Sequence, residues 1–209
     1  MVAAYLTVRR AATTEIEVKR SRFRCTVTRI DSEEAARAAV DRARAEHHDA
    51  RHHCSAFVLG PGGEVERAHD DGEPSGTAGA PMLEVLRGAG VSDVVAVVTR
   101  WFGGTLLGAG GLVRAYSDAV RESLDEAGTR RRVLLREFVL EAGHGDAGRI
   151  ESDLRGRGVF VLDTTYGADV LLRVGVGPDR EEMLHAALAE LTGGTVTAAV
   201  AGERWIDVG

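Results

Sequence analysis

The sequence has few of the features that mark membrane, secreted or disulfide-rich proteins. Its longest uninterrupted apolar run is the five residues Val94–Val98, whereas spanning a bilayer takes about 20. The first residues do not follow the basic, apolar and small-residue order of a secretory signal, so we expect none. Only two cysteines occur, Cys25 and Cys54, and they form no close pair of the kind that binds metal. These absences predict a protein of a reducing compartment, the cytoplasm, without membrane association.

Lysine is nearly absent as well, since Lys19 is the only one and the other basic residues are arginines. The formal net charge of −6 argues against nucleic-acid binding through bulk positive charge but leaves room for local basic patches. A content of 44% hydrophobic and 28% charged residues is that of an ordinary folded protein. The 209 residues are enough for one large or two small domains.

The first 128 residues predict a mixture of strands and helices. Alternating and β-branched segments predict strands over residues 5–10, 15–20, 22–30, 52–60, 64–69 and 93–102. Apolar stripes predict helices over residues 31–48, 80–90 and 111–128. Asp31 or Ser32 can cap the first helix, and Gly128 closes the third.

The pattern restarts after "GTRRRVLLRE" (128–137). Strands are predicted over 137–143, 159–166, 168–176 and 194–205, and helices over 146–157 and 179–192. The order βαββαβ is that of the ferredoxin-like fold. We therefore expect an α+β protein of two domains: residues 1–129, a linker over 130–136 whose three arginines lie on a solvated surface, and a ferredoxin-like domain over 137–209.

The stretch "TRWFGGTLLGAGGLVRAY" (Thr99–Tyr116) concentrates backbone freedom between a predicted strand and a predicted helix. Its five glycines are Gly103, Gly104, Gly108, Gly110 and Gly111. Unhindered N–H groups at a helix start attract anions, and Arg100 and Arg114 add guanidinium groups that suit a phosphate. Neither GxxxxGK[ST] nor GxGxxG is present, which disfavours ATP and NAD. The alternative is that the glycines only permit a sharp turn and close backbone packing.

A second loop, "HDDGEPSGTAGAP" (His69–Pro81), concentrates carboxylates and hydroxyls. They belong to Asp70, Asp71, Glu73, Ser75 and Thr77. Three carboxylates could hold Mg²⁺ shared with a substrate phosphate, and a hydrolase could use Ser75 as nucleophile with His69 as base. However, "GEPSG" is not the GxSxG elbow of hydrolases, and Thr77 can simply cap the helix that follows.

The histidine-rich segment "EHHDARHHC" (46–54) invites a zinc interpretation. His48 and His52 would share a helical face, with Asp49 or Cys54 completing the ligand set. The segment is predicted to pass from helix into strand, so this spacing does not hold on one element. We favour surface and edge histidines and expect no metal.

Long ordered segments of the first half closely resemble the N-terminal domain of the YigZ/IMPACT family. They are "SRF" (Ser21–Phe23), "DARHHCSAF" (Asp49–Phe57), "DDGEPSGTAGAPMLEVL" (Asp70–Leu86) and "VTRWFGGTLLGAGGLVRAYSDAV" (Val98–Val120). The second half is similar to the smaller C-terminal domain of bacterial members, which resembles a ferredoxin-like domain of elongation factor G. The family pattern FGG-x-K-LG contains a lysine that this chain lacks, and we assign its position to Leu107.

The resemblance implies an N-terminal fold like the second domain of a small-subunit ribosomal protein, and a role in regulating translation. We therefore expect a binding protein rather than an enzyme, which contacts RNA, the ribosome or a translation-related protein through the glycine-rich loop. No cofactor and no DNA sequence specificity are expected. The alternative is a Mg²⁺-dependent hydrolase or phosphotransferase that uses Asp70, Asp71, Glu73 and Ser75.

Overall fold

The computed structural model describes residues 2–208, in which residues 4–131 and 132–208 form two compact units. The strands of the N-terminal unit are β1 (Ala4–Val8), β2 (Ala12–Val18), β3 (Ser21–Arg29), β4 (His52–Leu59), β5 (Val65–His69) and β6 (Val94–Trp101). Its helices are α1 (Glu33–Glu46), α2 (Gly79–Gly88) and α3 (Ala109–Ala127). Five of the strands form one sheet in the order β2-β3-β6-β4-β5, and every neighbouring pair is antiparallel.

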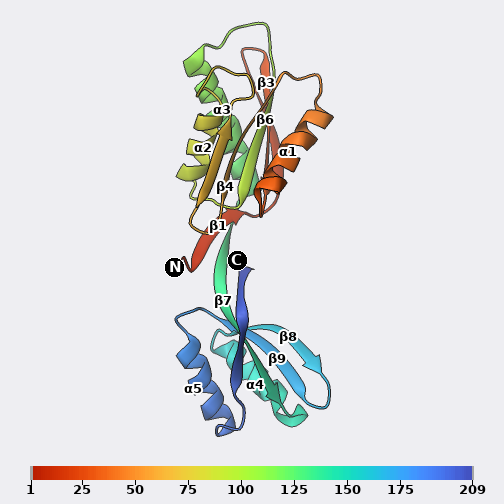
Figure 1. Cartoon of the computed structure of the whole chain (residues 1–209), viewed down its shortest axis with the longest axis vertical. Helices are drawn as coiled ribbons and strands as arrows, with labels where there is room; N and C mark the ends of the chain where they lie inside the picture. Colours follow the sequence, from red (N-terminus) through yellow and green to blue (C-terminus); the bar gives the residue numbers. More distant parts are fainter. Residues whose placement is uncertain (1, 209) are drawn as a thin grey trace. The chain divides into compact units, whose positions relative to one another are not determined.

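Helices cover this sheet on both faces. α2 and α3 lie on one side and α1 on the other (Figure 1). The larger core, under α2 and α3, contains Phe23, Val98 and Tyr116, whereas the smaller core under α1 contains Phe57 and Val97. Because successive residues of a strand face opposite sides, Arg100 on β6 points to the α3 side together with Val98.

The helix boundaries of this unit agree with the sequence patterns except at the glycines. Ser32 caps α1, where its Oγ accepts the N–H of Ala35 at 3.2 Å. α3 begins at Ala109, two residues before the predicted start, so Gly110 and Gly111 belong to its first turn rather than to the loop.

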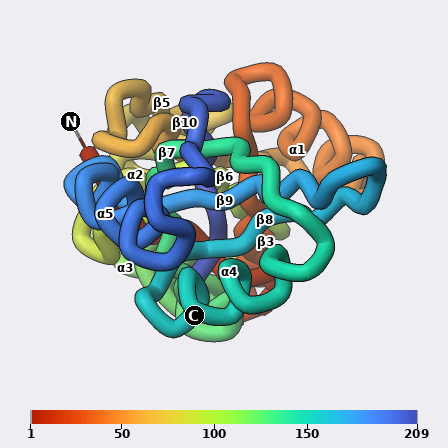
Figure 2. The backbone as a smooth tube through the Cα atoms, turned by 90° about the horizontal axis from the view of Figure 1, so that it is seen from below, coloured from red at the N-terminus to blue at the C-terminus, as the bar shows by residue number. Residues whose placement is uncertain are grey.

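The C-terminal unit contains β7 (Thr129–Ala142) from Arg132 onward, and the elements α4 (His144–Gly156), β8 (Phe160–Tyr166), β9 (Val170–Val176), α5 (Glu181–Thr192) and β10 (Ala198–Val208). β9 lies between β7 and β8, and β10 also pairs with β7. The hairpin strands β8 and β9 run side by side in Figure 2. Helices α4 and α5 cover a core that includes Phe138, Ile150 and Leu184. This is the expected ferredoxin-like arrangement.

The expected linker is not a separate segment. Residues 130–136 are part of the 14-residue strand β7, and the compact units divide between Arg131 and Arg132. Leu134 and Leu135 are buried, so the arginine run opens a strand with an apolar centre rather than a solvated connection. Within residues 2–208, no helix has the length and apolar character needed to cross a bilayer.

Candidate functional site

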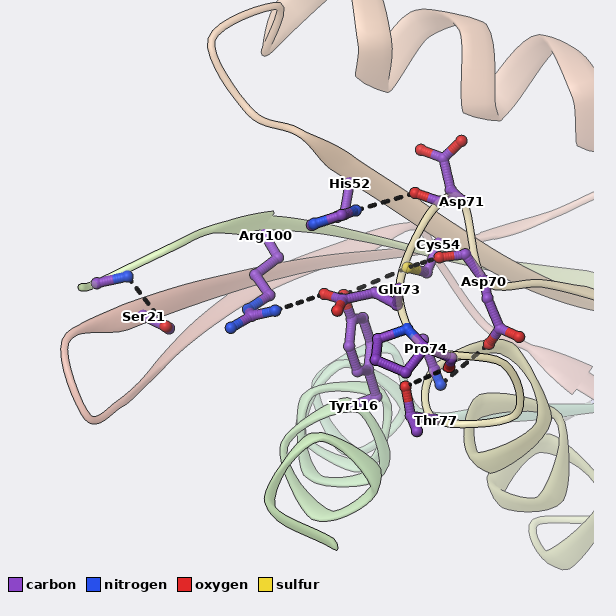
Figure 3. Close-up of polar contacts among 12 residues, drawn as sticks. Ser21, His52, Cys54, Asp70, Asp71, Glu73, Pro74, Thr77, Arg100 and Tyr116 are labelled. Carbon is purple, nitrogen blue, oxygen red and sulfur yellow. Dashed lines mark hydrogen bonds and ion pairs between the residues drawn. The ribbon is translucent and has the colours of Figure 1, made fainter. Parts of the chain in front are cut away.

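The two unusual loops of the N-terminal unit meet at a buried ion pair. Glu73 comes from the loop between β5 and α2 and points between β6 and α3 (Figure 3). Its Oε1 accepts hydrogen bonds from Arg100 Nη1 and Tyr116 Oη, both at 2.7 Å. The side chains of Arg100 and Glu73 are only 7% and 3% exposed. The carboxylate therefore compensates a buried guanidinium and fixes the acidic loop to β6.

This pairing changes the role expected of Arg100. We expected it to flank the glycine-rich loop as an available phosphate ligand. Instead, its guanidinium carbon lies 5.4 Å from the centre of the Phe23 ring and 5.7 Å from that of the Phe102 ring. Its buried Nε has no hydrogen-bond partner within residues 2–208. The cause is its position on the core face of β6, where a charge needs a carboxylate partner.

Tyr116 and Cys54, which also lie beside Glu73, are held in their neutral forms. Burial raises the pKa of the Tyr116 phenol, and the neighbouring Cys54 and Glu73 raise it further. Burial raises the pKa of the Cys54 thiol to about 12. Its Sγ donates to the carbonyl oxygen of Asp70 at 3.0 Å and lies 3.3 Å from Tyr116 Oη. A thiol in this state is not a ready nucleophile at neutral pH.

Asp70 is committed to the start of α2. Its Oδ1 accepts the N–H groups of Ala78 at 3.1 Å and Gly79 at 2.8 Å, and its Oδ2 accepts that of Gly76 at 2.7 Å. Partial burial raises the pKa of Asp70, but these three N–H donors outweigh that effect and hold the pKa below its ordinary value. The carboxylate thus serves as the cap that we had assigned to Thr77.

Asp71 joins its loop to α1 and β4. Its Oδ1 accepts from Arg44 Nη2 and its Oδ2 from the N–H of His53, both at 2.7 Å. Its carbonyl oxygen lies 2.9 Å from His52 Nδ1. The residue has a positive φ of 45°, a conformation that aspartate tolerates better than most side chains.

The residues named for the hydrolase alternative are not assembled into one site within residues 2–208. Thr77 donates its hydroxyl back to the Pro74 carbonyl at 2.6 Å. Ser75 is exposed, and among residues 2–208 no hydrogen bond joins it to His69. Each of the three carboxylates has its own partners. In the same part of the chain, no group of three or more His, Cys, Asp or Glu side chains is arranged to hold a metal ion.

Gly103 is the point at which the glycine-rich loop contacts the β2–β3 turn. Its N–H donates to Ser21 Oγ at 3.0 Å, and a Cβ atom added to it would lie 2.0 Å from the carbonyl carbon of Arg20. Only glycine allows so close an approach. The turn residues Lys19 and Arg20 have positive φ angles of 48° and 66°, and Arg20 Nη2 donates to Thr105 Oγ1 at 3.1 Å. Sequence reasoning missed these two cations.

The start of α3 leaves two backbone donors available. The N–H groups of Gly111 and Leu112 donate to the Gly108 carbonyl at 3.1 and 2.9 Å. Those of Ala109 and Gly110, by contrast, have no hydrogen-bond partner within residues 2–208, and no side chain caps the helix. Free N–H groups at a helix start carry partial positive charge. Gly104 and Gly108, at φ of 81° and 74°, shape the loop that leads to them.

Exposed cationic and apolar side chains border these donors. Arg114 is exposed, and the single hydrogen bond of its side chain within residues 2–208 is from Nε to the Gly110 carbonyl, at 3.2 Å. Phe102 and Leu106 are 54% and 83% exposed, whereas Leu107 packs against the core. The family pattern FGG-x-K-LG, aligned on the glycines of this chain, has its lysine at Leu106, so its assignment to Leu107 is wrong by one residue.

These features define the class of protein: two α+β units, the first of which presents a helix start bordered by cations, and the second of which is ferredoxin-like. A model of the Impact N-terminal domain matches residues 19–124, and one described as a domain of unknown function matches residues 140–195.

Similar relatives are known along nearly the whole chain. "IMPACT family member YigZ" of Escherichia coli (strain K12) is 42% identical over 86% of this chain and 89% of its own length. "IMPACT family member YvyE" of Bacillus subtilis (strain 168) is 40% identical over 93% and 89%. A crystal structure described as that of a hypothetical protein is 38% identical, with a TM-score of 0.64 over 96% of this chain and 98% of that one. The chain therefore belongs to the IMPACT family.

Proposed function

We propose that the chain binds RNA, free or within the ribosome, and acts through this contact as a cytoplasmic regulator of translation. The contact is a phosphate rim, which we define as Lys19, Arg20, Arg114 and the N–H groups of Ala109 and Gly110. The observation that carries the proposal is the close approach at Gly103, which brings the Lys19–Arg20 turn against the glycine-rich loop.

The rim has the chemistry that phosphate binding requires. Arg114 and Lys19 are exposed, and in residues 2–208 neither forms an ion pair with a carboxylate. N–H groups at a helix start add fixed donors that do not depend on pH. Phe102, 54% exposed beside the loop, offers a ring on which an unpaired base can stack. This local patch is compatible with a net charge of −6, because recognition depends on where the cations lie.

Salt dependence of RNA binding tests the proposal. Structured RNA is titrated against wild type and an Arg20→Ala/Arg114→Ala variant at several salt concentrations. Removing one phosphate-binding side chain should flatten the slope of log affinity against log salt by about 0.7–0.9. The matched control is Arg10→Ala/Arg121→Ala, which removes two arginines of the same unit that are 61% and 60% exposed and lie away from the rim, paired with Glu126 and Asp118. Equal slopes for the two variants would rule out the rim.

A protein partner is the second candidate, and exposed apolar side chains favour it. Leu106, 83% exposed, lies four residues after Phe102 on the same loop, and such side chains are typical anchors of protein interfaces. If a translation-related protein is the ligand, Phe102→Ala/Leu106→Ala should abolish its capture while the salt slope for RNA stays unchanged. RNA binding that depends on Arg20 and Arg114 would instead retain the first proposal.

A further inference from the structure

The N-terminal unit has a pocket of about 400 Å³ that the proposed function does not use. It lies between α1 and the strands β4 and β5, and it contains none of the rim residues. His53 and Ser55 are two residues apart on β4 and therefore share a face of the strand. Ser55 is directly opposite His69 on β5. Two imidazoles and a hydroxyl are thus brought together on the α1 side of the sheet.

Two of these residues are largely buried, and each turns a hydrogen-bonding atom without a partner in the described part of the chain toward the open pocket. His53 is 5% exposed and Ser55 is 4% exposed. Nδ1 of His53 lies 3.1 Å from Thr99 Oγ1, but its Nε2 and the Oγ of Ser55 form no hydrogen bond within residues 2–208. Both atoms are open to the pocket rather than sealed from water, so a bound group can reach them. Because both side chains line the pocket, a ligand or ordered water in it would supply the missing partners.

Two of the three carboxylates of the pocket lining, those of Asp70 and Asp71, are already engaged. Asp70 accepts three backbone N–H groups, and Asp71 accepts from Arg44 and from the His53 N–H. Asp41 is 75% exposed and lies 4.0 Å from Arg44. The carboxylates of Asp70 and Asp71 are therefore satisfied by local partners, whereas the Asp41 carboxylate lies in solvent at the edge of the pocket.

Its donors, by contrast, remain available. Arg37 is 69% exposed, and its contacts with Glu33 and Glu34 are long, at 3.7 and 4.0 Å. When Thr99 donates to Nδ1 of His53, the ring presents Nε2–H to the pocket. Together with the Ser55 hydroxyl, these groups offer hydrogen-bond donors from a helix and a strand. Converging donors at the inner end of the pocket, where the carboxylates of Asp70 and Asp71 are already satisfied, favour an oxyanion.

We infer that this pocket binds a phosphomonoester group, with the Ser55 hydroxyl and His53 Nε2–H at its buried end and the Arg37 guanidinium at its open end. A volume of 400 Å³ falls within the range of small-ligand sites, so it has room for the ester group beyond the phosphate. The phosphate can come from a free nucleotide or from the 5′ end of an RNA, because both present the same dianion.

The test is a titration of the full chain followed by NMR. Inorganic phosphate and a nucleoside 5′-monophosphate are added at constant ionic strength, with sodium chloride as the reference. We expect saturable shifts of the His53 and His69 ring resonances. Ser55→Ala should weaken phosphate binding about tenfold, since it removes a hydrogen bond to a charged group. The matched control is Ser117→Ala, a buried serine outside this pocket, which should bind phosphate as wild type does.

The outcomes separate this inference from the RNA proposal. A short RNA with a 5′-phosphate that binds more tightly than its 5′-hydroxyl form, through Ser55, would assign the RNA end as the source. Binding of the mononucleotide alone would assign the free ligand. Ring resonances that move no more than with chloride, or a Ser55→Ala variant that binds as wild type does, would overturn the pocket. Either result would leave the salt-slope test of Arg20 and Arg114 intact.

Discussion

Replacing Glu73 by glutamine should lower the urea concentration at which the N-terminal unit unfolds well below that of the wild type. The change keeps the size of the side chain but removes the charge opposite Arg100. That guanidinium has a 7% exposed side chain, and its Nη1 donates to Glu73. Removing one member of a buried pair costs about 3–5 kcal/mol. This is a large share of the roughly 5–15 kcal/mol that stabilises an ordinary domain.

The two tryptophans make the measurement specific to one unit. Trp101 lies on β6 of the N-terminal unit and Trp205 on β10 of the C-terminal unit. In a Trp205→Phe background, Trp101 fluorescence therefore follows urea unfolding of the N-terminal unit alone. The control is Asp118→Asn, which breaks a pair with Arg121 whose side chains are 59% and 60% exposed. Such surface pairs contribute about 0–1 kcal/mol.

A second variant separates the effect of charge from that of packing. Arg100→Met combined with Glu73→Leu removes both charges and fills the space with apolar atoms, so it should lose less stability than Glu73→Gln alone. Our account of the buried pair would be refuted if Glu73→Gln cost no more than Asp118→Asn. It would also be refuted if the double variant lost the sum of the two single effects.

Three further predictions concern the same unit. Gly103→Ala should lower the urea midpoint followed by Trp101 fluorescence, because the added Cβ would overlap the β2–β3 turn. Gly110→Ala is the control, since a Cβ added there meets no atom within 4 Å. Equal midpoints for the two variants would contradict the close approach at Gly103. The folded state holds the pKa of Asp70 below its ordinary value, so the ionised carboxylate stabilises the fold at pH values above that ordinary pKa, and this stabilisation is lost as the pH falls through the lowered pKa. The difference in unfolding free energy between wild type and Asp70→Asn should therefore shrink below about pH 4. A difference that stays constant with pH would exclude the cap. Burial raises the pKa of Cys25 and of Cys54 to about 12, so both thiols should resist a disulfide reagent at pH 8 until urea is added; rapid reaction of the native protein would contradict their burial.

Local signals predicted most of the elements of this fold. The apolar stripe and the candidate caps Asp31 and Ser32 placed α1 within two residues at each end, and the β-branched run Val94–Val98 identified β6. The order of elements after Gly128 was enough to predict the ferredoxin-like unit, because βαββαβ allows few compact arrangements. The linker prediction was wrong because three consecutive arginines do not reveal whether the segment pairs with another strand, and residues 130–136 are part of β7.

The site could be predicted only in part. Alternate residues of a strand share a face, so Arg100 lies on the same face of β6 as Val94 and Val98, and the burial of Arg100 could have been predicted from the sequence. Its partner could not, since Glu73 is 27 residues away and reaches it only through the folded loop. Lys19 and Arg20 were missed for the same reason: their place beside the rim depends on contact with Gly103, which no local pattern encodes.

The backbone amides at the start of α3 provide the most direct test of phosphate binding at the rim. The ¹H–¹⁵N resonances of Ala109 and Gly110 are followed as RNA is added, with Gly111 as the internal reference because its N–H already donates to Gly108. We predict that the first two move strongly, in proportion to the RNA bound, and that Gly111 moves little. If RNA binds but the resonances of Ala109 and Gly110 do not shift, phosphate binding at the rim is contradicted.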